Sequence, residues 1–135
     1  MMECCNKCVA CMNKCPTGAI RQNRFLISAE KCLTFFNEKS YNFPGWINPA
    51  WHNCLIGCMR CQDVCPVNKD YDKYIVPGGE FSEEETLMIL KGVSKDKLPL
   101  ETIEKLKKLC LLGEYNLLQR NLEVLIRKNG VRSIV

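Results

Sequence analysis

Apolar residues recur at helical spacing along the last third of the chain. Ser82 and Glu85 form a capping box, a pair that opens a helix because each side chain satisfies a backbone N–H of the first turn. This helix is expected to continue through Leu90 and Lys91. It is expected to stop at Gly92, because glycine is favoured just after a helix end.

Two further helical patterns follow. Pro99 suits the first position of a helix, because its missing N–H needs no partner there. The apolar positions of that helix are Leu100, Ile103, Leu106 and Leu109. The third pattern ends at Asn129-Gly130, and its apolar positions are Leu117, Leu118, Leu122, Leu125 and Ile126. Together they predict a small packing unit with Cys110 in its core, and its solvated face would carry Lys105, Lys107 and Lys108.

The first half of the chain shows no sustained helical period. Two short apolar runs, Ala19-Ile20 and Phe25-Leu26-Ile27, flank the polar segment Arg21-Gln-Asn-Arg24, which predicts a short hairpin. Strands this short cannot bury a core of their own. We therefore expect this half to depend on bound metal for its stability.

Pro77-Gly78-Gly79 marks a boundary, because these residues interrupt regular structure. We expect a metal-organised domain over 1–77 and a helical unit over 80–135. The 135 residues, 47% hydrophobic and 25% charged, suit a globular chain but not a large enzyme. No apolar run approaches the roughly 18 residues of a membrane span, and residues 1–5 lack a signal-peptide core. A cytoplasmic protein without a membrane partner is expected.

Ten of the eleven cysteines lie within residues 1–65, and most belong to a repeat. The first copy has the spacing C-x2-C-x2-C-x3-C-P and consists of Cys5, Cys8, Cys11 and Cys15-Pro16. The second copy lacks one upstream cysteine and consists of Cys58, Cys61 and Cys65-Pro66. The first spacing is typical of bacterial two-cluster ferredoxins, in which the fourth cysteine binds the other cluster. The repeat therefore predicts two [4Fe–4S] clusters ligated crosswise.

Zinc and disulfides are the alternatives to clusters. Zinc sites use cysteine pairs separated by a longer loop, not four cysteines within eleven residues. Disulfides are rare in a reducing compartment, and the odd number of cysteines also disfavours them. The formal net charge is +4, but eight thiolates and two cluster cores of about +2 each would bring it near zero. Net charge therefore gives little support to nucleic-acid binding.

Residues from about 3 to 70 resemble the double [4Fe–4S] domain of the epoxyqueuosine reductases and related corrinoid-dependent proteins. The resemblance rests on residues 8–20, 27–36 and 57–69. Residues 82–130 loosely resemble the HEAT-like C-terminal helices of the same family. The resemblance implies an α+β fold, with a two-cluster bacterial ferredoxin-like module followed by a small HEAT-like helical unit.

The resemblance also implies a ligand set. In that family a cysteine after a basic residue supplies the ligand missing from the second motif, and here Cys32 follows Lys31. The implied ligands of the first cluster are Cys5, Cys8, Cys11 and Cys65. Those of the second cluster are Cys15, Cys32, Cys58 and Cys61. Cys4 and Cys54 would then be spare, although spacing alone leaves Cys54 as an alternative to Cys32.

Enzymes of this family carry a long N-terminal domain that binds cobalamin and holds the catalytic acid. This chain begins only a few residues before the first motif, so we expect no catalytic residues in it. The expected function is one-electron transfer to a redox partner protein or to a separate or missing cobalamin-binding catalytic domain. The alternative is a tRNA- or corrinoid-protein-docking module in which the clusters are mainly structural.

Several residues outside the motifs are candidates for a role near the clusters. His52 is interpreted as a hydrogen-bonding loop residue rather than a ligand. Shielding of the second cluster is expected from Tyr41, Phe43, Trp46 and Trp51. The chain end has a positive bias that could contact tRNA or simply face solvent, and its basic residues are Arg120, Arg127, Lys128 and Arg132.

Overall fold

The computed structural model describes residues 3–22 and 26–128. Its α-helices are α1 (Ala10–Lys14), α2 (Leu33–Asn37), α3 (Arg60–Asp63), α4 (Glu83–Leu90), α5 (Leu100–Lys108) and α6 (Tyr115–Lys128). Short 3-10 turns lie between them, namely η1 (Glu3–Asn6), η2 (Ala29–Lys31), η3 (Pro49–Trp51), η4 (Pro66–Asn68), η5 (Tyr71–Tyr74) and η6 (Lys95–Lys97). None of the described helices is long and apolar enough to cross a membrane.

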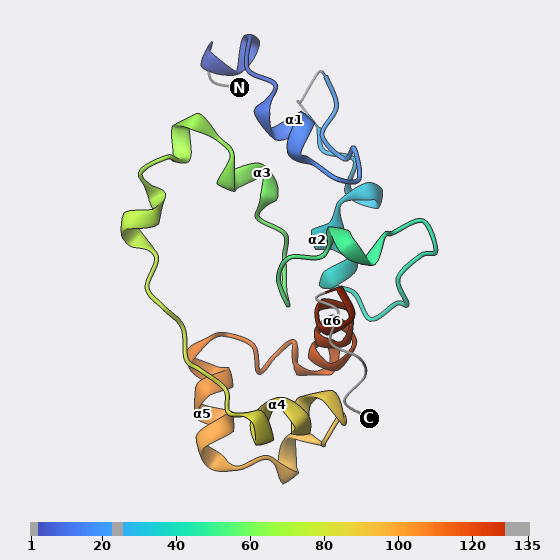
Figure 1. The fold of residues 1–135 in the computed structure, drawn as a ribbon, viewed down its shortest axis with the longest axis vertical. Coiled ribbons are helices and arrows are strands. Elements are labelled where there is room, and N and C mark those ends of the chain that lie inside the picture. The colour runs from blue at the N-terminus through green and yellow to red at the C-terminus, as the bar shows by residue number, and fades with distance from the viewer. Residues whose placement is uncertain (1–2, 23–25, 129–135) are drawn as a thin grey trace.

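The cysteine-rich segment and the later helices meet through α6. Figure 1 shows α1 and α3 towards one end of the molecule and α4 and α5 towards the other, with α6 close to α2. α1 packs against α3, which brings the two cysteine motifs together. α6 contacts both α4 and η3, so the last helix touches both halves of the chain.

The predicted start and stop of α4 are confirmed. The Ser82 hydroxyl accepts from the Glu85 N–H (3.2 Å), and Glu85 Oε2 accepts from the Ser82 N–H (2.7 Å), which completes the capping box. At the other end, the N–H groups of Gly92 and Val93 donate to Ile89 and Met88. Gly92 has a φ of +62°, a left-handed conformation that glycine adopts without strain.

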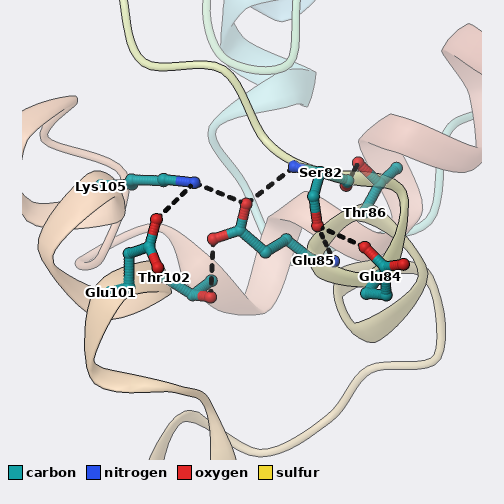
Figure 2. Close-up of polar contacts among 7 residues, drawn as sticks. All are labelled: Ser82, Glu84, Glu85, Thr86, Glu101, Thr102 and Lys105. Carbon is teal, nitrogen blue, oxygen red and sulfur yellow. Dashed lines mark hydrogen bonds and ion pairs between the residues drawn. The ribbon is translucent and has the colours of Figure 1, made fainter.

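Glu85 also ties α4 to α5 (Figure 2). Its buried carboxylate accepts from Lys105 Nζ (2.8 Å) and from the Thr102 hydroxyl (2.8 Å). The Lys105 contact and the Ser82 N–H are the main reasons that the pKa of Glu85 falls to about 2. The charged carboxylate therefore stabilises the fold above pH 4.5, and this contribution is lost as the pH falls towards 2. The prediction that Lys105 merely faces solvent is wrong, because it pairs with Glu85 and also with Glu101.

The ends of α5 differ in detail from the prediction. Pro99 is the N-cap of α5 rather than its first helical residue. Cys110, predicted in the core, is exposed and has a φ of 56°. It occupies the left-handed position after the helix, where its N–H donates to Lys107 and the Leu111 N–H donates to Leu106. This reversal of the chain carries the Cys110 side chain outward. The predicted end of α6, Asn129-Gly130, lies outside the described residues.

The later helices share one apolar core. Its buried members are Ile89, Leu98, Leu106, Tyr115 and Leu118. Leu55 and Ile56, from the segment before the second cysteine motif, also pack against it. The core of the helical unit is therefore completed by residues of the cysteine-rich half.

The cysteine-rich half buries few side chains. Its buried apolar residues are Ala19, Leu33 and Ile47. Among the described residues, the predicted hairpin amounts to one antiparallel bridge between Ile20 and Ile27, with the Ser28 N–H donating to Ala19. Residues 23–25 of that hairpin lie outside the described residues. The α+β fold class and the two domain ranges stay predictions.

Candidate metal centre

Four cysteines surround one pocket. They come from three separate segments and are Cys15, Cys32, Cys58 and Cys61. Most of the pocket wall is apolar and includes Ala19, Ile20, Ile27 and Leu33. The structure thus brings together, around one mostly apolar pocket, four of the cysteines singled out in the sequence.

The Cys15 sulfur sits in a turn rich in hydrogen-bond donors. Its Sγ lies 3.5 Å from the Thr17 hydroxyl. Burial raises the pKa of Cys15. Hydrogen bonds from the Thr17 side chain and from the backbone N–H groups of Thr17, Ala19 and Ile20 lower it by more, so the pKa lies below its usual range. Gly18, with a φ of +64°, turns the chain here. This environment stabilises a thiolate, the form of cysteine that binds metal.

Cys58 and Cys61 sit in a drier environment. Burial is the main cause that raises the pKa of each thiol above its ordinary value. The neighbouring Cys54 and Cys32 thiols contribute to the rise at Cys58, and the Cys58 and Cys15 thiols contribute at Cys61. The four sulfurs are therefore close enough to interact, and bound iron would have to displace the protons of the buried thiols.

Cys54 lies near this pocket but does not line it. Its thiol donates to the Gly57 carbonyl oxygen at 3.2 Å. Burial raises the pKa of Cys54, which favours the protonated thiol that this hydrogen bond requires. Cys54 thus neighbours Cys58, but its thiol is engaged with the Gly57 carbonyl.

The cysteines of the other predicted cluster lie near the N-terminal end. Cys5, Cys8, Cys11 and Cys65 are all half-buried. Desolvation, and then the neighbouring Cys5 and Cys65 thiols, raise the pKa of the exposed Cys4 thiol. Cys4, predicted to be spare, thus lies beside two of the predicted ligands.

Within residues 3–22 and 26–128, no three His, Cys, Asp or Glu side chains converge on a single metal ion. One zinc ion binds each thiolate at about 2.3 Å, so its sulfurs lie within about 4.6 Å of one another. The four thiolates of a cubane bind four different irons and stand farther apart. The described residues therefore form no preassembled site for a single ion.

The aromatic residues expected to shield the second cluster do not line the pocket; they are Tyr41, Phe43, Trp46 and Trp51. The His52 ring is buried against Phe43, with ring centroids 4.5 Å apart, and its Nδ1 has no hydrogen-bond partner. His52 is hydrogen-bonded, as predicted, but through its backbone rather than through Nδ1: its N–H donates to Pro49 and its carbonyl accepts from Lys128. Burial, followed by the charges of Arg120 and Lys128, lowers the pKa of His52 and keeps the ring neutral.

Two of the basic residues near the chain end point into the molecule. Lys128 Nζ donates to the His52 carbonyl (2.7 Å), and Arg120 donates to the Phe36 carbonyl near the end of α2 and to the Lys39 carbonyl just after it. Arg127 pairs loosely with Glu123. Arg132 lies outside the described residues. Two of the four basic residues that the sequence places near the chain end are thus engaged in hydrogen bonds within the fold.

Comparison with known families identifies the first half of the chain. Residues 4–68 match the 4Fe-4S double cluster binding domain, a stretch that contains both cysteine motifs and Cys32. The chain is therefore an iron–sulfur protein that binds two [4Fe–4S] clusters.

Its curated relatives include epoxyqueuosine reductases. The Bacillus subtilis enzyme is 34% identical over 87 residues, which cover 64% of this chain and 22% of that protein. The Escherichia coli enzyme is 40% identical over 68 residues, covering 50% of this chain and 18% of that protein. The chain thus spans about a fifth of the length of these relatives. No solved structure gives a significant match.

Proposed function

We propose that this chain passes single electrons through its two clusters to a separate catalytic domain, as the electron-feeding part of an epoxyqueuosine reductase-like enzyme. The observation that carries the proposal is the apolar pocket ringed by four cysteines from three segments. The similarity to the epoxyqueuosine reductases supports the kind of enzyme it serves.

The proposed ligands follow the two motifs crosswise. Cys5, Cys8, Cys11 and Cys65 would hold cluster one. Cys15, Cys32, Cys58 and Cys61 would hold cluster two. The pocket supports the second set, and the packing of α1 against α3 supports the exchange of Cys15 and Cys65 between motifs. Each cluster, when bound, accepts and returns one electron.

The chain's own residues would tune this transfer. The apolar part of the pocket wall, including Leu33 and Ala19, would limit the contact of cluster two with water. The Thr17 hydroxyl and nearby backbone N–H groups are placed to donate to the Cys15 sulfur. Such hydrogen bonds stabilise the more negative, reduced state and so raise the potential.

A redox titration of the anaerobically purified protein, followed by electron paramagnetic resonance, tests this function. We expect both clusters to be reduced reversibly within the known range of about −700 to +450 mV. Thr17→Val keeps the side-chain shape but removes the hydroxyl, so we expect one potential to become more negative while the other stays unchanged. Clusters that stay inert over the whole range would contradict electron transfer and favour a docking module held together by its clusters.

A further inference from the structure

The last helix reaches into the segment that joins Cys32 to Cys58. Arg120 on α6 donates from Nη2 to the Phe36 carbonyl (2.8 Å) and from Nη1 to the carbonyls of Lys39 (2.8 Å) and Tyr41. Its guanidinium carbon lies 4.1 Å from the centroid of the Phe43 ring. Arg120 thereby holds the backbone that follows α2.

Asn121, the next residue on α6, connects two parts of this segment. Its Nδ2 donates to the Asn37 carbonyl at 2.9 Å and to the Leu55 carbonyl at 2.6 Å. Arg120 Nε and Nη2 donate to its Oδ1 at 3.0 and 2.9 Å, which fixes the orientation of the amide. Asn121 is 1% exposed, so each of these contacts is made out of water.

Asn37 makes a second connection between the same two parts. It is fully buried, and its Nδ2 donates to the Gly57 carbonyl at 2.6 Å. Asn37 ends α2, the short helix that Cys32 caps, while Gly57 immediately precedes Cys58. Two buried asparagines, Asn37 and Asn121, thus join the helix that follows Cys32 to the segment that precedes Cys58. We call this pair the asparagine bracket.

We propose that Asn121 is a positioning residue for cluster two, acting through the asparagine bracket on Cys32 and Cys58. The inference rests on the ligand assignment of the proposed function. A cluster binds tightly only if its ligands are held at fixed positions, and residues behind the ligands supply that support. Cys32 and Cys58 are far apart in sequence, and the bracket joins their segments by buried hydrogen bonds. The helical unit therefore contributes directly to the metal centre.

The test compares iron release in two single-cluster backgrounds. Cys11→Ala is expected to leave cluster two, and Cys32→Ala is expected to leave cluster one. In the first background, Asn121→Ala should speed iron release to a chelator about ten-fold and change the paramagnetic resonance of the reduced cluster. In the second background, Asn121→Ala should change neither the rate of iron release nor the paramagnetic resonance. Asn116→Ala, an exposed asparagine on the same helix, is the matched control and should leave both backgrounds unaltered.

A second variant separates positioning from loss of folding. Asn121→Asp keeps the oxygen that accepts from Arg120 but lacks the two donors to Asn37 and Leu55, so it should reproduce the faster release while circular dichroism stays unchanged. Iron release that speeds up equally in both backgrounds, or in neither, would overturn this inference but leave the ligand assignment standing. Backgrounds that do not retain about four irons each would overturn the ligand assignment, and the inference with it.

Discussion

Replacing Cys32 with alanine should remove about four of the eight irons, whereas replacing Cys54 should leave all eight in place. Cys32 lines the pocket together with Cys15, Cys58 and Cys61. Cys54 lies outside it, and its thiol proton is engaged with the Gly57 carbonyl. Iron and acid-labile sulfide, measured on the anaerobically purified variants, are the direct readout.

The signal of cluster one should survive both changes, because its proposed ligands include neither Cys32 nor Cys54. Cys110→Ala offers a neutral comparison, since this exposed cysteine lies in the turn after α5. Iron that falls in Cys54→Ala but persists in Cys32→Ala would reverse the assignment of the two residues.

Removal of both clusters should unfold the cysteine-rich half while much of the helix remains. The helices α1 to α3 are only 5, 5 and 4 residues long, and isolated helices of this length are not stable in water. The helices α4 to α6 are 8, 9 and 14 residues long and share a buried core. Circular dichroism after chelation should therefore retain a substantial helical signal, while protease cleavage moves into residues 3–77.

The helical unit should lose some stability in the same experiment. Leu55 and Ile56 help to cover its core, and Asn121 is held by carbonyls of the cysteine-rich half. We expect a lower melting temperature without clusters, rather than a complete loss of helix. A complete loss would show that the two halves fold only as one cooperative unit.

Local signals in the sequence predicted local structure well. The Ser82–Glu85 box and the Gly92 stop depend on residues within a few positions of one another, and α4 has both features. Lys105 was misplaced because its partner lies on another helix, and Cys110 because the helical pattern was continued past the left-handed residue that ends α5. The chain reversal after α5 exposes Cys110, and the buried Glu85 of α4 attracts Lys105.

In the candidate site, too, local features could be predicted from the sequence and long-range contacts could not. The spacing of the motif cysteines predicts clusters, because these ligands lie close together in sequence. Cys32 was singled out by resemblance, since nothing in its spacing to Cys58 requires it to be a ligand. Asn37 and Asn121 carry no sequence signal, because 84 positions separate them and only the folded chain brings them together.

The most direct test of the account is the metal content of the protein purified without oxygen. Two cubanes require about eight irons and eight acid-labile sulfides per chain. We expect these amounts, together with a reduced spectrum that contains contributions from two [4Fe–4S] centres. Zinc without acid-labile sulfide, or iron for only one cluster in the unaltered chain, would contradict it.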